Sequence, residues 1–189
     1  MTLDFTNVLK GVVTQTLLMA LLERGGYRVT RLGIEELFGE VKHIDIQQYL
    51  ALNLPLPLRY LPDLLVAEID MTHVFLVEVK FRRAFDKNAV ESLHEELKKQ
   101  REHWPQAYAA IMIAEPVVAD GKFHQDYIRL LKPLEHDILL DTQLPLAQRW
   151  ERLHHLQRVF TRFNNDRYIL DVQKSADTMT QTLHDLAKL

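Results

Sequence analysis

The chain contains no cysteine among its 189 residues. Disulfides, thiolate zinc sites, iron–sulfur clusters and cysteine nucleophiles are therefore excluded. Long apolar runs are also scarce, since the longest one near the start, residues 12–22, is interrupted by Thr14, Gln15 and Thr16. That run is too short to span a bilayer and lacks a signal-peptide cleavage pattern. We therefore expect a soluble, cytoplasmic protein without a membrane partner.

Several motifs of well-known enzyme classes are missing. The chain has no GxxxxGK[ST], GxGxxG or GxSxG motif, and its nine histidines form no HExxH. Nucleotide-driven chemistry, dinucleotide chemistry, an α/β-hydrolase and a zinc site are thus disfavoured. The formal net charge of -3 does not indicate a nucleic-acid binder. A nuclease, however, needs a basic cleft rather than a positive net charge over the whole protein, so the net charge does not exclude that class.

Apolar periodicity predicts the elements of the N-terminal two thirds. Apolar residues recur at helical spacing before Gly25-Gly26, which ends the pattern. Two strand-like runs then flank residues 70–72, and this short join predicts an antiparallel hairpin. The predicted elements are a helix over about 8–24, strands over 27–32, 59–69, 73–82 and 107–114, and helices over about 45–52 and 87–103.

The C-terminal third predicts a further strand at 136–140, a helix over 146–163 and a final helix within 171–189. Apolar content of 47% and charged content of 26% are those of an ordinary globular protein. The element order predicts a single α/β domain with a mixed four- or five-stranded central sheet flanked by helices. Its core would cover about 8–140, with a helical C-terminal extension over about 143–189.

The predicted hairpin carries charged residues where apolar ones are expected. Asp63 opens the first strand run, and Glu78 and Lys80 interrupt the second. Strand side chains alternate between faces, so Glu78 and Lys80 project from the same side. Burying ionised groups is costly unless they pair or hold a metal. A folding argument alone would not choose these residues.

At these positions the chain resembles the PD-(D/E)xK nuclease superfamily, which includes restriction endonucleases and archaeal Holliday-junction resolvases. Pro62-Asp63 is similar to the PD element, and Glu78-Val79-Lys80 is similar to the (D/E)xK element on the following strand. The resemblance covers about residues 8–114, from the first helix to the strand after the long helix. It implies a restriction-endonuclease-like core.

The resemblance also implies an activity, the metal-dependent hydrolysis of phosphodiester bonds in DNA. Asp63, Glu78 and the backbone carbonyl of Val79 would hold Mg²⁺ or Mn²⁺, hard cations that take oxygen ligands. Lys80 would position or activate the attacking water. Cutting both strands often requires two active sites, so the resemblance also accommodates a homodimer.

The first helix departs from the family pattern. Several branches place a glutamate where this chain has Gln15, whose amide oxygen can ligate Mg²⁺ but brings no charge. A substitute carboxylate would have to come from elsewhere, and the candidates are Glu23, Glu35, Glu36 and Glu68. On the long helix, Gln100 is an accessory candidate beside the apolar stripe. The candidate nucleic-acid-binding residues are Arg82, Arg83, Lys98 and Lys99.

Two alternatives to an active nuclease stay open. Gln15 and the acidic net charge fit a nuclease-like fold that binds nucleic acid or a protein partner without catalysis. The other alternative is an unrelated α/β domain in which Glu78 and Lys80 form a surface ion pair. In that case Asp63 and Glu78 would lie far apart.

Overall fold

A computed structural model describes residues 5–39, 41, 44–115, 117–119, 122–124, 127–135, 137–164, 182 and 185. The helices are α1 (Phe5–Arg24), α2 (Ile34–Leu37), α3 (Ile46–Ala51), α4 (Leu56–Arg59), α5 (Lys87–Arg101), α6 (Asp137–Leu140), α7 (Leu146–Arg152), α8 (Leu156–Val159) and the 3-10 helix η2 (Thr161–Asn164). The strands are β1 (Tyr27–Arg31), β2 (Leu64–Glu68), β3 (Val74–Arg82), β4 (Tyr108–Ile113), β5 (Val117–Ala119), β6 (Lys122–His124) and β7 (Ile128–Leu131). None of the helices in this described part of the chain has the length and apolar character needed to cross a membrane.

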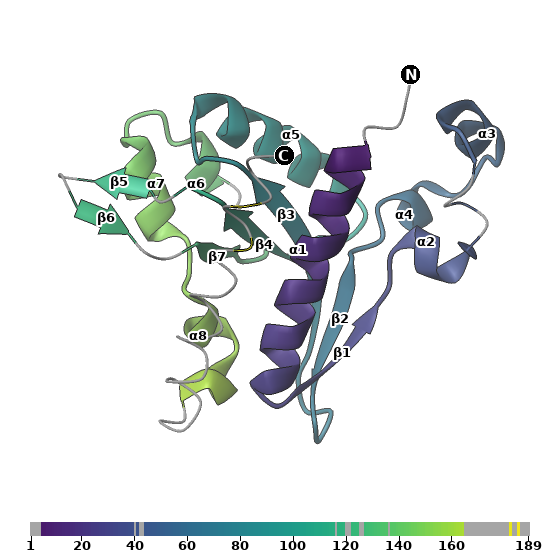
Figure 1. Ribbon diagram of the computed structural model, residues 1–189, viewed down its shortest axis with the longest axis horizontal. Helices are drawn as coiled ribbons and strands as arrows, with labels where there is room; N and C mark the ends of the chain where they lie inside the picture. The colour runs from purple at the N-terminus through teal and green to yellow at the C-terminus, as the bar shows by residue number, and fades with distance from the viewer. Residues whose placement is uncertain are drawn as a thin grey trace.

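Five strands form one mixed sheet in the order β1-β2-β3-β4-β7. The pairs β1–β2, β2–β3 and β4–β7 are antiparallel, whereas β3 and β4 are parallel because α5 connects them. Helices α2 to α4 lie at the β1 side of the sheet, and the β5–β6 hairpin lies at the opposite side (Figure 1). The predicted mixed α/β sheet flanked by helices is confirmed.

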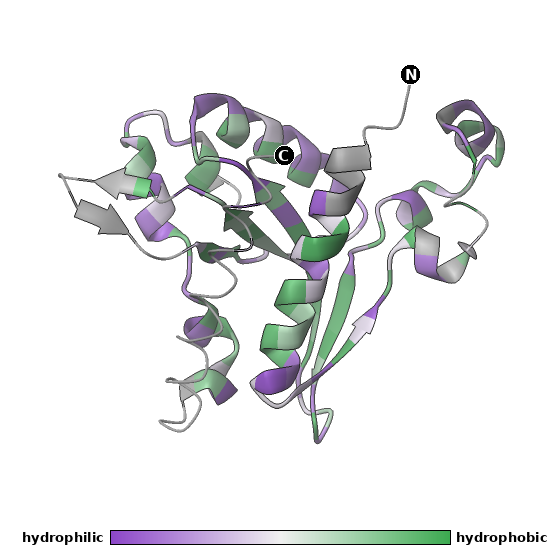
Figure 2. Cartoon of the chain, viewed as in Figure 1, coloured by the Kyte–Doolittle hydropathy of each residue, from purple (hydrophilic) through white to green (hydrophobic). Residues whose placement is uncertain are grey.

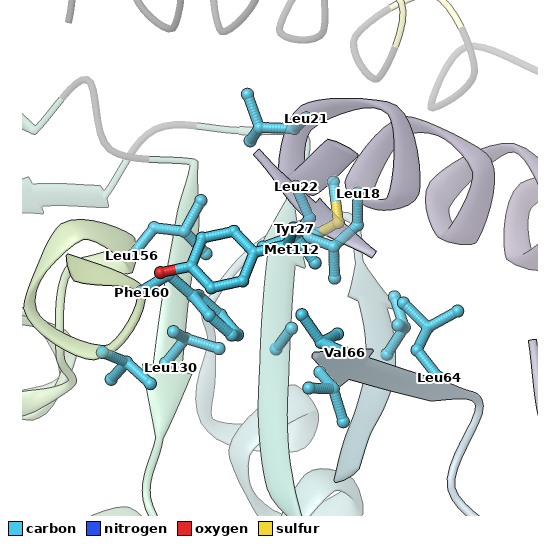
Figure 3. Close-up of a cluster of buried hydrophobic side chains, with 14 of the residues drawn as sticks. Leu18, Leu21, Leu22, Tyr27, Leu64, Val66, Met112, Leu130, Leu156 and Phe160 are labelled. Atoms are coloured by element: carbon cyan, nitrogen blue, oxygen red, sulfur yellow. The ribbon is translucent and has the colours of Figure 1, made fainter. Parts of the chain in front are cut away.

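Two hydrophobic clusters cover the two faces of the sheet. The first joins α1, α8 and η2 to residues such as Leu64, Val66 and Met112 (Figure 3). The second joins α5, α6 and α7 to Ile111 and Leu131. Successive strand residues therefore alternate between the clusters, as side chains of a strand must. The sheet is buried on both faces around β4, which accounts for the unbroken apolar run of that strand.

Local chemistry explains several element boundaries. Asp45 and Gln48 form a capping box at the start of α3, and the Asp86 side chain accepts a hydrogen bond from Ala89 N at the start of α5. Gly26 has φ +83°, a conformation that favours glycine, where the chain leaves α1. The predicted hairpin turn is present, with Thr72 N donating to the Asp70 side chain at 3.2 Å. These signals were readable in the sequence.

Two strand predictions need correction, and one strand of the sheet was not predicted. The predicted strand over 59–69 begins at Leu64, since Leu56–Arg59 form helix α4. Residues 137–140 form helix α6 rather than a strand, because a short apolar run does not distinguish the two by periodicity. The fifth strand is instead β7, over Ile128–Leu131.

The helix predicted over 146–163 is divided into α7, α8 and η2 rather than continuous, and the chain changes faces of the sheet within it. At His154 the backbone leaves the helical path and exchanges two hydrogen bonds of 2.8 Å with Leu130 of β7. Trp150 before this point packs in the cluster under α5, whereas Phe160 after it packs in the cluster under α1. One straight helix cannot reach both faces. The final helix predicted within 171–189 lies outside the described residues, apart from positions 182 and 185.

Candidate active site

The β2–β3 hairpin brings Asp63 and Glu78 to neighbouring positions. Leu64 pairs with Val77 in the antiparallel register, so Asp63 lies across from Glu78 one position before β2 begins. The two arms are paired rather than splayed. Asp63 and Glu78 are therefore neighbours across the hairpin and do not lie far apart. Hydrophilic residues of β3 interrupt the otherwise apolar centre of the sheet (Figure 2).

Two different elements hold the Asp63 carboxylate. Its Oδ1 accepts a hydrogen bond of 2.8 Å from Gln15 Nε2 of α1. Its Oδ2 accepts one of 2.7 Å from the backbone N–H of Val79. The N–H and C=O of one strand residue point to the same neighbour, so the Val79 carbonyl is also directed toward the Asp63 side of β3. Three oxygen atoms that could serve as metal ligands, two from Asp63 and one from Val79, are therefore on this side of β3.

The Glu78 carboxylate is held from its own strand and from α5. Its Oε1 lies 2.8 Å from Lys80 Nζ, and its Oε2 accepts a hydrogen bond from Gln100 Nε2. Glu78 is 9% exposed and Gln100 is 5% exposed, so both are buried. Gln100 therefore faces the site and is not on a solvated edge of the helix.

A line of polar contacts between β3 and α5, which we call the β3–α5 network, continues from this pair. Its members are Glu78, Lys80, Arg82, Ser92, Glu96 and Gln100. Glu96 lies at its centre, with its carboxylate 3.3 Å from Lys80 Nζ and 2.6 Å from Arg82 Nη2. The Ser92 hydroxyl donates to the same carboxylate at 2.7 Å. The contacts run in register because two strand residues advance about 6.6 Å and four helix residues advance about 6 Å.

Electrostatics in the network favour charged side chains. Burial acts to lower the pKa of Lys80, but three neighbouring carboxylates, with Glu78 the strongest, raise it above its ordinary value. Burial acts to raise the pKa of Glu96, but the Ser92 hydrogen bond and two adjacent cations lower it overall. The Lys80 side chain is 23% exposed and points into the network rather than into bulk solvent. Lys80 is therefore an ammonium ion at neutral pH in this arrangement.

The chemical types of Asp63, Glu78 and Val79 suit a hard divalent cation. They offer two carboxylates and a backbone carbonyl, all oxygen ligands, and each carboxylate oxygen retains a lone pair beyond the hydrogen bond it accepts. Among the described residues, no group of three or more Asp, Glu, His or Cys side chains is placed to hold a metal ion. Mg²⁺ commonly uses one or two carboxylates and keeps several waters, so the two acids fit that ion. They do not fit a closed structural zinc site.

The candidate nucleic-acid-binding residues do not form one cluster. Arg82 belongs to the network, but Arg83 points elsewhere and pairs with Glu115 at 2.7 Å. Lys98 and Lys99 are exposed on the last turns of α5. The structure brings Gln15 and Gln100 to the two acids from opposite faces of the sheet.

The candidates for an additional carboxylate do not converge on Asp63. Glu68 lies at the hairpin end of β2 and contacts Thr72 and His73. Glu36 lies 4.0 Å from Arg31, and Glu23 is exposed near the end of α1. The side chain of Glu35 lies outside the described residues.

Sequence reasoning missed Glu96. A signal for it existed, since Ser92, Glu96 and Gln100 recur at a spacing of four and therefore share one helix face. Matching this spacing to the alternate residues of the 73–82 strand would have paired Glu96 with Lys80.

Comparisons with family models, with curated proteins and with solved structures give no match for this chain.

Proposed function

We propose that this protein is a metal-dependent nuclease of the PD-(D/E)xK type that hydrolyses phosphodiester bonds of DNA. The observation that supports the proposal is that Asp63 lies across the hairpin from Glu78, whose Oε1 is 2.8 Å from Lys80 Nζ. Apart from the short helices α2 to α4 between β1 and β2, the order of helix, three antiparallel strands, helix and parallel strand agrees with the restriction-endonuclease-like core that the motif implies. Folding alone gives no reason to place two acids and a lysine there.

Asp63, Glu78 and the Val79 carbonyl would hold Mg²⁺ or Mn²⁺. Such an ion supplies Lewis-acid chemistry, acidifying a bound water and neutralising charge on the phosphoryl group. Gln15 orients Asp63, and Gln100 orients Glu78, so the two carboxylates are preorganised from both sides of the sheet.

Lys80 has its own task in this proposal. Hydrolysis adds water across a P–O ester bond, with one proton lost by the water and one gained by the leaving oxygen. An ammonium group beside the phosphate orients the water and stabilises the negative charge that develops in the transition state. The raised pKa of Lys80 favours these charged roles over that of a general base.

Nicking of supercoiled plasmid tests the proposal. We expect cleavage with Mg²⁺ or Mn²⁺ that is lost in chelator, and a loss of about 100-fold or more in Asp63→Asn, Glu78→Gln and Lys80→Met. Glu115→Gln and Lys87→Met are matched controls, since both residues are ion-paired outside the site. Unchanged cleavage in all three folded site variants would refute the assignment.

A second candidate is a nuclease-like module that binds nucleic acid or a protein without catalysis. It is favoured by one observation: Gln15 donates an N–H to Asp63 at the position where several branches of the resembled superfamily place a glutamate. Calorimetry separates the two candidates. Absence of Mg²⁺ and Mn²⁺ binding together with salt-sensitive DNA binding would support the module and exclude the enzyme.

A further inference from the structure

Two aromatic rings stack beside the candidate site. The rings of Tyr60 and His103 have centroids 5.4 Å apart and an interplanar angle of 16°. Both side chains are half-buried and lie outside the two hydrophobic clusters. The pair is therefore accessible from the surface rather than part of the core.

The positions of these rings are fixed by the backbone that carries them. Tyr60 caps the end of α4, and the N–H of His103 donates to the Gln100 carbonyl at 3.0 Å at the end of α5. The Trp104 indole donates to the Pro57 carbonyl at 2.8 Å and ties α4 to this end of α5. The stack is thus held by two elements that are joined to each other.

The ring pair is next to the proposed metal site. Tyr60 precedes Asp63 by three residues, so their Cα atoms are at most about 11 Å apart. His103 lies in the turn that follows α5, and its N–H donates to the carbonyl of Gln100, the residue that contacts Glu78. Lys99 is exposed on the last turn of α5, four residues before His103 in the chain. The end of α5 therefore supplies both a cation for a phosphate and a ring for a base.

We infer that Tyr60 and His103 form a stacking platform for a nucleobase adjacent to the scissile phosphate, with Lys99 contacting a neighbouring phosphate. In a duplex both faces of a base are covered by neighbouring bases, so this platform serves a single strand or a frayed end. The inference rests on the proposed function only in taking nucleic acid as the ligand.

Binding to metal-free protein in chelator tests this platform without catalysis. Fluorescence anisotropy at fixed salt compares an oligodeoxythymidylate with an abasic strand of the same length and charge. Base stacking on aromatic side chains corresponds to an affinity ratio of about 5- to 160-fold. We expect the wild type to prefer the thymidine strand by a ratio in that range, and Tyr60→Phe to retain the preference.

Tyr60→Leu and His103→Leu should each lose most of this preference. The matched control is Tyr49→Leu, which removes a tyrosine of α3 whose ring lies 5.7 Å from the Arg59 guanidinium. Melting temperatures establish that each variant is folded, and His103→Leu leaves the Trp104–Pro57 contact in place if Tyr60→Leu does not fold. Equal wild-type affinity for both strands, or a full preference in folded His103→Leu, would overturn the inference.

This test is separable from the nuclease proposal. A protein that prefers the thymidine strand but does not cleave with Mg²⁺ or Mn²⁺ supports the platform and contradicts the enzyme. A protein that cleaves but binds both strands equally supports the enzyme and contradicts the platform.

Discussion

The two faces of β3 carry different kinds of side chain, apolar on one face and charged on the other. On the α1 face, Val77 and Val79 pack into a cluster of apolar side chains, as the interior of a folded domain requires. On the α5 face, Glu78 and Lys80 occupy equivalent central positions and are surrounded by polar partners. The first face is explained by folding, whereas the second needs another reason. A candidate functional site can thus occupy half of a strand while the other half stabilises the fold.

The largest stability effect is expected on the apolar face. Leu64 is 0% exposed and lies next to Asp63 in the chain, so Leu64→Ala should lower the free energy of unfolding by about 2–5 kcal/mol. Denaturant unfolding measures this loss. Leu134→Ala is the control, since that side chain is 77% exposed, and it should change stability little. Equal losses in the two variants would break the distinction between the faces.

Gln15→Glu should have the next largest effect, and its sign should depend on metal. Without metal, the new carboxylate loses the hydrogen bond to Asp63 and repels it, which should cost about 1–3 kcal/mol. Mg²⁺ should then raise the melting temperature of this variant more than that of the wild type, because it binds the folded state. Gln157→Glu, on an exposed position of α8, should show neither effect. A variant that is destabilised equally with and without Mg²⁺ would argue against a metal at this site.

The pH dependence of the free energy of unfolding should reveal the contribution of Glu96 at acid pH and that of Lys80 at alkaline pH. The folded-state pKa of Glu96 is lowered, so its contribution is present above its ordinary value of 4.5 and lost as pH falls through the folded-state value. The pKa of Lys80 is raised, so its contribution is present below its ordinary value of 10.5 and lost as pH rises through the folded-state value.

Glu96→Gln should therefore flatten the acid limb of the stability curve. The change should be under about 1 kcal/mol, because Glu96 is 41% exposed and solvent screens its charge. Chemical unfolding across the acid range measures it. Glu91→Gln, which removes an exposed acid near Lys87, should leave that limb unchanged.

The smallest effect on stability is expected for the double variant Glu78→Gln, Lys80→Met. Replacing a largely buried ion pair by neutral residues of similar volume is often neutral or stabilising, and the introduced amide oxygen still accepts a hydrogen bond from Gln100. We expect the free energy of unfolding to stay within about 1 kcal/mol of the wild type, while cleavage is lost. Thermal or denaturant unfolding checks the first part. A loss of several kcal/mol would mean that the polar face serves the fold.

Much of the fold was predictable because its signals are local. Helix α1, the β2–β3 hairpin, α5 and β4 follow from apolar spacing, turn residues and caps. The prediction of one continuous helix over 146–163 failed although its apolar residues do recur at helical spacing. Trp150 and Phe160 pack on different faces of the sheet. The hydrogen bonds between His154 and Leu130 are tertiary contacts that no local apolar pattern encodes. Strand β7 was missed because the buried Arg129 interrupts its apolar run.

The same contrast applies to the site. Asp63, Glu78 and Lys80 were predictable because polar residues stand out in apolar strands. Their hydrogen-bond partners Gln15 and Gln100 were accessible only as candidates, since α1 and α5 approach the hairpin from different faces. Glu96 required knowing which turn of α5 lies over Lys80.

The polar residues of β3 and those of α5 recur at matching distances, and this match fixes the position of the helix along the strand. Sliding α5 by one turn in the direction that moves Glu96 over Glu78 would oppose two carboxylates and leave Arg82 without its acid. The alignment of the helix is thus encoded by the order of charges as well as by the shape of the apolar residues beneath it. Movement of α5 along the strand in that direction would therefore break these pairs of opposite charge.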